Sequence, residues 1–557
     1  MNKPQNIMKI AFLSEQLYLL ALVGLFSLPS IPIAAQELPK QLHLQVTVNS
    51  DLDGAITPDT FLTLREAIEL VNGTLSLNRL SAAEKAQVKS LNPNVPSRIN
   101  FNLPPKQTTI RLNSILPPLV SPGVIVDGKT QPGYATKSGR LNRTFVKELP
   151  LPVIAITPAE NVEIFRGLTV VADNITVRGI SLYGFSAKFG ATASTPPADI
   201  FIADWLTANE TSHQQYLQPA LPLAQNQPPQ GVVIENNWLG NFPYRVDNST
   251  KKVTVIGIVY DFPRSAFGVS VFNSVGTTIR NNLITNHDGS GIITGKQATN
   301  LRISGNVIER NGLAGMPDAI RMEGNIQNTE IISNLIEGNA GSAVFLFKPK
   351  GSLQIRNNDI KFNGERFNRA AIYLMGDNHQ VTGNQIGNQN GAGVVVAAYP
   401  ESKGNIIQAN RFNALTGLSI DLVTQQNVSV QDYQQGDGVN PPRNSRNRRK
   451  ETGNAAINAP QFLAREFYIL NSKVNIDGVA DPGSQIDIYL TDGNNQDYGD
   501  LKRSLATVTA DAKGRFGVTL SNLKPGERIS AIATHPQYGT SEPALNAVVR
   551  SLPTAKY

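Results

Sequence analysis

Short runs of alternating aliphatic and polar residues fill the middle of the chain, and each run leads into an asparagine with another aliphatic two positions later. The asparagines of this aliphatic-x-x-Asn-x-aliphatic word are Asn237, Asn282, Asn306, Asn334, Asn358, Asn384 and Asn410, so the intervals from Asn282 onward are 24, 28, 24, 26 and 26 residues. An α-solenoid needs two helices of period 3.6 in a repeat of about 34 to 47 residues. The shorter repeat and the period of two predict a coil of short β-strands.

A second run of alternating aliphatics follows each asparagine word. One column of this run is Ile292, Ile320, Val344, Ile372, Val394 and Leu418, and the column two positions later is Thr294, Met322, Leu346, Leu374, Val396 and Ile420. Residues two apart on a strand share one face, so both columns are expected to point into the core. The residues between them are expected to point outward: Ile293, Arg321, Phe345, Tyr373, Val395 and Ser419.

The repeated asparagines are predicted to form a structural ladder. Stacked coils place like residues about 4.8 Å apart. An asparagine at the same corner of every coil can then bond to the next asparagine and tolerate the left-handed backbone of a sharp corner. This interpretation is preferred to a catalytic or ligand-binding role for the seven residues.

In this repeat pattern the chain resembles right-handed parallel β-helix proteins, with residues 95–435 as the solenoid. The stretch DTFLTLREAIELVNGT, residues 59–74, resembles the motif of the CSLREA-type domain of exported bacterial surface proteins, although it has no cysteine. Thr63 and Glu66 have the spacing of a capping box, and the apolar positions from Leu64 to Val71 share one helical face. Residues 36–94 are therefore predicted to be a cap over the open end of the solenoid, with Arg65 as a surface charge.

Residues 1–35 are predicted to be a signal peptide. Lys3 and Lys9 precede a short apolar stretch from Leu17 to Leu28, and small residues at 34–35 offer a cleavage site. An uncleaved membrane anchor is the alternative, and no later stretch is expected to span a membrane. The chain is therefore expected to be extracellular or on the cell surface, with the periplasm as the alternative.

Two stretches interrupt the repeat pattern. Residues 186–230 are read as an insertion that is either a functional loop or a flexible flap. Residues 436–458 are polar and basic, which is typical of a solvated linker, although such a run can also contact acidic polysaccharide, lipopolysaccharide phosphate or nucleic acid. Because the chain is expected to be exported, nucleic acid is not an expected partner of this basic run.

Residues 459–557 change to longer alternating runs separated by turn sequences such as Asp481-Pro482-Gly483. This pattern predicts an antiparallel β-sandwich. The stretches DAKGRF and ISAIATHPQYGTSEP are similar to those of bacterial immunoglobulin-like (Ig-like) repeats of surface proteins, and the resemblance implies a stalk or adhesion module without a disulfide.

Composition excludes several kinds of chemistry. The 557 residues contain no cysteine, which rules out disulfides, thiolate metal sites and cysteine nucleophiles. No phosphate-binding loop or dinucleotide motif is found, and no cofactor is predicted. The stretch SDLDG at 50–54 resembles the start of a calcium loop without its continuation, so Ca²⁺ stays an unsupported alternative and no metal ligand is assigned.

The outward face of the coils carries the candidate functional residues. Polysaccharide hydrolysis or elimination needs carboxylates or a base beside a cation, and the candidates are Glu309, Glu337, Asp288 and Asp318, with His287, Asp377 and Lys361 as further groups. Phe345 and Tyr373 are expected to form an aromatic platform for sugar rings, flanked by Arg321. The preferred hypothesis is a binding or adhesion scaffold for polysaccharide or cell-envelope glycan; the alternatives are a polysaccharide lyase or glycoside hydrolase and a purely structural envelope protein.

Overall fold

The computed structural model describes residues 43–557 except 142–143, 188–194, 206–226, 241–243, 248–251, 256–262, 400, 425–433, 442–444, 446–450, 493–496 and 553–557. The expected signal peptide therefore lies outside the described residues. So do all five basic residues of the expected linker, which are Arg443, Arg446, Arg448, Arg449 and Lys450. Within the described residues, no helix has both the length and the apolar character needed to cross a membrane.

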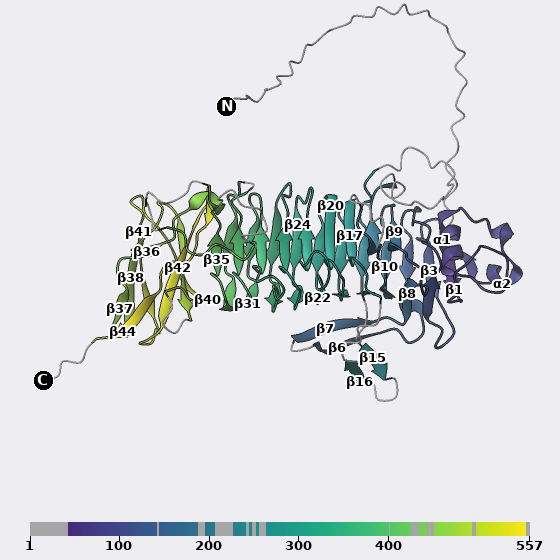
Figure 1. The fold of residues 1–557 in the computed structure, drawn as a ribbon, viewed down its shortest axis with the longest axis horizontal. Helices are drawn as coiled ribbons and strands as arrows, with labels where there is room; N and C mark the ends of the chain where they lie inside the picture. Colours follow the sequence, from purple (N-terminus) through teal and green to yellow (C-terminus); the bar gives the residue numbers. More distant parts are fainter. Residues whose placement is uncertain are drawn as a thin grey trace, which may run out of the picture. The chain divides into compact units, whose positions relative to one another are not determined.

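The repetitive region is a parallel β-helix in which successive coils supply strands to three sheets (Figure 1). Sheet A is β2 (Val88–Ser90), β1 (Leu44–Val48), β3 (Arg98–Phe101), β5 (Ile125–Asp127), β10 (Thr176–Arg178), β13 (Val233–Glu235), β18 (Thr278–Arg280), β21 (Arg302–Ser304), β24 (Thr329–Ile332), β27 (Leu353–Arg356), β30 (Gln380–Thr382) and β33 (Ile406–Gln408). Sheet B is β4 (Thr109–Leu112), β8 (Ile154–Pro158), β11 (Ile180–Leu182), β14 (Trp238–Leu239), β19 (Leu283–Thr285), β22 (Val307–Glu309), β25 (Leu335–Glu337), β28 (Asp359–Lys361), β31 (Gln385–Gln389) and β34 (Arg411–Leu415). Sheet C is β9 (Arg166–Val170), β12 (Ala198–Ile202), β17 (Val269–Val275), β20 (Ile292–Thr299), β23 (Ile320–Met322), β26 (Val344–Leu346), β29 (Ile372–Leu374), β32 (Val394–Val396) and β35 (Ile420–Leu422).

The inward columns of sheet C have the predicted register except at the last coil. Val344 pairs with Ile372 and Ile372 with Val394, and all three are fully buried. Val394 then pairs with Ile420 rather than with Leu418. A period of two cannot distinguish registers that differ by two residues, so the outward residue of this coil is Asp421 and not Ser419.

The seven predicted asparagines form one continuous hydrogen-bonded ladder. The side-chain oxygen of Asn334 accepts from the backbone N of Asn306 at 2.9 Å and from its amide nitrogen at 3.0 Å, and Asn334 donates to Asn358 at 3.0 Å. Its amide also donates to the carbonyl of Ile303 at 2.9 Å. Because both polar atoms of the Asn334 side chain are hydrogen-bonded, the free-energy cost of burying this amide is compensated.

One detail of the ladder prediction was wrong. The ladder asparagines do not adopt the left-handed conformation; the residue immediately before each of them does, namely Asn236, Asn281, Gly305, Ser333, Asn357, Gly383 and Ala409. The corner is therefore divided between two neighbours, one that turns the backbone and one that bonds to the next coil.

The N-terminal cap contains helix α1 (Leu64–Asn72), with the 3₁₀ turn η1 (Leu77–Arg79) and helix α2 (Ala82–Lys85) after it. The capping box is present, since Glu66 N donates to the Thr63 hydroxyl and Thr63 N donates to the Glu66 carboxylate. Arg65 was expected to be a surface charge, but it is buried against Asp53, with Nε 2.8 Å from Oδ1. It also donates to the carbonyls of Ser114 and Ile115, which anchors the helix to the first coils.

The expected insertion at 186–230 contains a regular strand. Residues 198–202 are β12, which pairs in parallel with β9 and β17 and belongs to the solenoid. Two hairpins extend the coils elsewhere: β6 (Ala135–Leu141) with β7 (Thr144–Leu151), and β15 (Tyr244–Asp247) with β16 (Lys252–Val255). The 3₁₀ turn η2 (Gly128–Thr130) follows β5 directly.

The C-terminal residues form a separate, largely antiparallel sheet system. Its elements are η4 (Gly453–Ala456), β36 (Gln461–Phe462), β37 (Glu466–Leu470), β38 (Lys473–Val479), β39 (Gln485–Thr491), β40 (Leu501–Thr509), β41 (Arg515–Ser521), β42 (Arg528–His535), β43 (Gly539–Thr540) and β44 (Ala547–Ser551). The all-β character matches the expectation from sequence, while the Ig-like assignment stays a prediction.

This domain closes the end of the solenoid. Gly404 N donates to Tyr538 O at 2.9 Å and Thr540 N donates to Asn405 O at 2.9 Å, so a single parallel bridge between Asn405 and Gly539 joins the start of β33 to β43. Asn405 N donates to the Asn454 side chain at 3.1 Å. The described part of the expected linker is also bonded in place, because Asn440 N donates to Glu542 at 2.9 Å.

Candidate functional site

The predicted aromatic platform is not open. Phe345 and Tyr373 do lie on adjacent coils with ring centres 5.2 Å apart, but they are only 1% and 2% exposed. The guanidinium groups of Arg321 and Arg369 lie 5.0 and 5.9 Å from the centre of the Phe345 ring. The outward column of sheet C is therefore covered, and these rings are not available to a ligand.

The predicted carboxylates are not brought together in one site. Glu309 and Glu337 are paired neighbours on sheet B, and Lys361 Nζ lies 3.8 Å from Glu337. Asp318 is fully buried, with Arg369 Nη1 2.9 Å from its Oδ1. Asp288 lies in another loop, where Arg264 Nε is 2.5 Å from its carboxylate. Glu337, Asp318 and Asp288 are thus each paired with a different cation.

His287 belongs to a buried polar network. Its Nε2 lies 2.9 Å from Asp199 Oδ2 and its Nδ1 lies 2.7 Å from the side-chain oxygen of Asn311. The Ser265 hydroxyl donates to the other oxygen of Asp199. The carboxylate stands between serine and histidine, and all three residues are fully buried, so this is not the arrangement of an activated serine nucleophile.

A second ladder, which was not predicted, begins at His287, whose backbone N donates to the side-chain oxygen of Asn311. Asn311 donates to Asn339 at 3.0 Å and Asn339 donates to Asn363 at 2.8 Å. The signal was present in the sequence, because each member follows a residue of the first ladder by five positions: His287, Asn311, Asn339 and Asn363. Gln389 occupies the equivalent position on the next coil, but its amide donates to the carbonyl of Arg369 instead.

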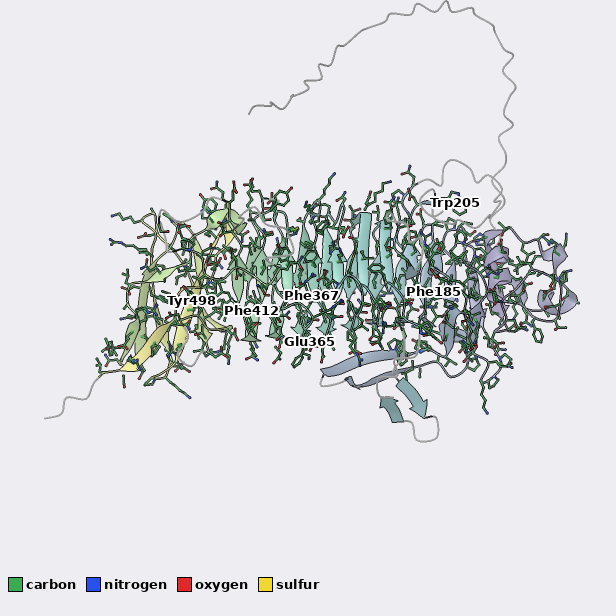
Figure 2. The ribbon with its side chains drawn as sticks, in the orientation of Figure 1. Phe185, Trp205, Glu365, Phe367, Phe412 and Tyr498 are labelled. Carbon is green, nitrogen blue, oxygen red and sulfur yellow. The ribbon has the colours of Figure 1, made fainter. Side chains whose placement is uncertain are left out.

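A concave site lies where the last coils meet the C-terminal domain. It is a cleft of about 980 Å³ lined by loops of three successive coils, by the segment after the solenoid and by the turn between β39 and β40. Figure 2 labels Tyr498 of that turn and Phe367 of the nearest long loop. Polar groups that line the cleft are Asn368, Asn390, Thr416, Ser419, Asp421, Gln435, Asp497, Tyr498 and Asp500.

Carboxylates dominate the charge of this cleft. Asp421 accepts from Gly438 N at 3.0 Å, and its pKa is raised by burial and by the negative charges of Glu542 and Asp437. Burial raises the pKa of Asp500 to about 6, with a further contribution from Asp492, against the lowering effect of a hydrogen bond from Leu415 N. No lysine or arginine is among the described lining residues.

A smaller groove of about 340 Å³ is lined by residues of β28, β31 and β34 of sheet B and by Lys502 of β40. Its lining includes Lys361, Arg411 and Lys502 together with Asp359. Lys502 Nζ pairs with Asp492 at 2.5 Å. The two hollows therefore differ in charge, with the cleft acidic and the groove mixed.

The described residues contain no group of three or more histidine or carboxylate side chains arranged to hold a metal ion. The candidate calcium stretch is used otherwise: Asp53 is bound by Arg65, and its Oδ2 also accepts from Asn113 N at 2.8 Å. The stretch therefore serves the N-terminal cap.

The raised pKa of Asp500 predicts a pH-dependent junction. An unperturbed aspartate has a pKa of about 3.9, so between about pH 4 and pH 6 the folded state retains a proton that the unfolded state releases. Protonated Asp500 therefore stabilises the folded state at low pH, and this stabilisation is lost as pH rises through about 6. Asp500→Asn is expected to raise the melting temperature relative to the unsubstituted protein at pH 7.5 and to change it little at pH 4.

The matched control is Asp511→Asn. Asp511 is exposed, and hydrogen bonds from the backbone N of Arg515 and Lys513 lower its pKa, so its contribution has the opposite sign and is lost as pH falls. Melting curves at the two pH values check both variants. An Asp500→Asn effect of equal size at pH 4 and pH 7.5 would contradict the prediction.

This chain is similar to a β-helix family model and to several solved structures. A family model described as "Right handed beta helix region" matches residues 231–367, which confirms the expected hand. Similar solved structures include ORF18 of Geobacillus virus E2, at 11% identity over 86% of this chain and 77% of that one with a TM-score of 0.41. Another is the tailspike protein of E. coli bacteriophage HK620 in complex with pentasaccharide, at 11% identity over 78% and 68% with a TM-score of 0.30. A third is the A-module of a mannuronan C-5 epimerase of Azotobacter vinelandii, at 14% identity over 58% and 86% with a TM-score of 0.27. No curated protein matches.

Proposed function

We propose that this β-helix protein is an exported surface or extracellular scaffold that binds carbohydrate or cell-envelope glycan in the cleft beside its C-terminal domain. The observation that carries the proposal is the cleft itself, which combines about 980 Å³ with the ring of Tyr498 and many hydrogen-bonding side chains. Sugars present both hydroxyls and an apolar ring face, so they need this mixture of groups.

The negative charge of the cleft indicates which glycans could bind in it. Asp421, Asp497 and Asp500 line it, and cations are absent from its described lining. Carboxylates accept hydrogen bonds from sugar hydroxyls and attract ammonium groups, whereas they repel the carboxylates and phosphates of acidic polysaccharides. The suitable ligand is an uncharged or amine-bearing glycan.

Tyr498→Ala tests this proposal. The purified chain is screened against neutral, amine-bearing and acidic polysaccharides, and the substitution is expected to weaken binding to the preferred one by about 1 kcal/mol or more, since a truncated aromatic contact costs this much. The control is Tyr468→Ala, because Tyr468 is an exposed tyrosine on β37 that does not line the cleft. Equal affinity in the Tyr498 variant and the unsubstituted protein would place binding elsewhere, and a panel without binding would favour a purely structural envelope protein.

A second candidate function is polysaccharide cleavage, which is favoured by the raised pKa of Asp500. A carboxyl with a pKa of about 6 can donate a proton near neutral pH, and Asp497 and Asp421 line the same cleft. If the protein cleaves its ligand, the panel will release reducing or unsaturated ends and Asp500→Asn will abolish that release. Binding without any released ends supports the scaffold.

Export and adhesion complete the proposal. They rest on the pattern of residues 1–35 and on the likeness of residues 59–74 and 459–557 to exported surface proteins. Sequencing of the secreted chain is expected to find a start near Gln36, and a chain that retains its first 35 residues would instead indicate an anchor.

A further inference from the structure

The loops that lead into sheet C alternate in length along the solenoid. Each loop can be measured from the second-ladder position to the first core residue of the strand that follows. The separations are five residues from His287 to Ile292, nine from Asn311 to Ile320, five from Asn339 to Val344, nine from Asn363 to Ile372 and five from Gln389 to Val394. A long loop therefore occurs at every second coil.

The two long loops carry exposed apolar side chains. Leu313 and Met316 are 40% and 42% exposed on the first, and Phe367 is 46% exposed on the second. The loops touch across the short loop between them, since Arg366 Nη1 donates to the carbonyl of Gly312 at 3.3 Å. They thus form one continuous ridge.

Phe367 is held in place by charged neighbours. The guanidinium groups of Arg366 and Arg369 lie 4.8 and 5.0 Å from its ring centre. Arg369 is in turn fixed by Asp318 at 2.9 Å. An oriented ring beside nitrogen donors combines an apolar surface with hydrogen-bonding capacity for hydroxyls.

Tyr498 lies at the same two-coil spacing from the Phe367 loop. The coil two positions beyond the Phe367 loop has only the short loop 415–419, but the C-terminal domain places Tyr498 there, and Thr416, Gly417 and Tyr498 line the cleft together. Asn368 of the long loop and Asn390 of the intervening loop complete the path between the two rings. Since coils are about 4.8 Å apart, the apolar contacts recur at intervals of about 10 Å along the axis.

We propose that the ridge binds an extended, uncharged polysaccharide lengthwise, with about one sugar per coil and an apolar contact at every second sugar. Tyr498 holds the sugars in the cleft, Phe367 contacts the chain two sugars away, and Leu313 and Met316 contact it two sugars farther. This inference rests on the proposed function and deepens it, because it makes the ligand a polymer whose length determines affinity. In Figure 2 the labelled Phe367 lies along the solenoid from Tyr498, toward the N-terminal coils.

The test is a length series with β-1,4-linked N-acetylglucosamine oligomers of two, four and six sugars, measured by titration calorimetry. The unsubstituted protein is expected to gain about tenfold in affinity from the shortest to the longest oligomer, equivalent to about 1.4 kcal/mol. Phe367→Ala should remove the gain at four sugars and leave the two-sugar affinity unchanged. Leu313→Ala should reduce affinity only for the six-sugar oligomer.

The matched control is Phe61→Ala, because Phe61 is 45% exposed in the N-terminal cap, away from the ridge. Affinity that does not rise with length, or a Phe367→Ala curve equal to that of the Phe61→Ala control, would overturn the inference. Failure of the six-sugar oligomer to bind a protein that binds another panel polysaccharide through Tyr498 would also overturn it, while the proposed function would stand. Loss of binding to every glycan would refute the proposed function itself.

Discussion

Replacing Arg65 with methionine is expected to lower the free energy of unfolding by about 3 kcal/mol, because breaking a buried ion pair leaves an uncompensated charge. The substitution would leave Asp53 buried without the guanidinium that now lies 2.8 Å away. It would also remove the donors to the Ser114 and Ile115 carbonyls that attach α1 to the solenoid. Urea denaturation checks the result through the midpoint of the transition.

Two further variants separate charge from packing. Asp53→Asn in the Arg65→Met background should restore part of the lost stability, because it removes the unpaired charge. Arg79→Met alters an exposed arginine of the same cap and should shift the midpoint little. An unchanged midpoint for Arg65→Met would mean that the pair does not hold the cap.

Asn334→Leu is expected to destabilise the solenoid by about 1 to 3 kcal/mol, the usual cost of unpaired buried polar groups. Asn334 bonds to Asn306, Asn358 and the Ile303 carbonyl, so its loss leaves groups on both neighbouring coils without partners. A leucine could not restore those bonds. Thermal and urea unfolding measure the change.

The control is Gln354→Leu, which makes the same chemical change at an exposed, outward position of β27. It should have an effect of less than about 0.5 kcal/mol, as surface substitutions usually do. Similar effects of the two variants would disprove the importance of the ladder for stability.

The ladder was predictable because it repeats. All seven asparagines of the first ladder could be assigned from a fixed pattern, since like positions on successive coils must meet in a parallel solenoid. The same argument would have found Asn311, Asn339 and Asn363, which share one offset from the first ladder. The cap helix was predictable for a local reason, since Thr63 and Glu66 are only three residues apart.

The candidate site was not predictable in the same way. Alternation shows that Phe345 and Tyr373 leave the core face of their strands, but it does not show what covers them, and Arg369 comes from a loop that periodicity does not describe. The cleft depends on Tyr498 meeting loops that lie about 80 to 130 residues earlier in the chain, so no local pattern marks it. The shift from Ser419 to Asp421 arose because registers that differ by two share one face.

The contact between the C-terminal domain and the last strand of sheet A has a consequence for self-association. A parallel solenoid whose last coil is uncovered exposes the backbone groups that every internal coil pairs with its neighbour, so another molecule could stack on that edge. Here the C-terminal domain of the same chain lies against β33, since Thr540 N donates to Asn405 O and Ile407 N donates to the Thr540 hydroxyl. The C-terminal domain therefore occupies the position in which another molecule would have to stack on the last coil of sheet A.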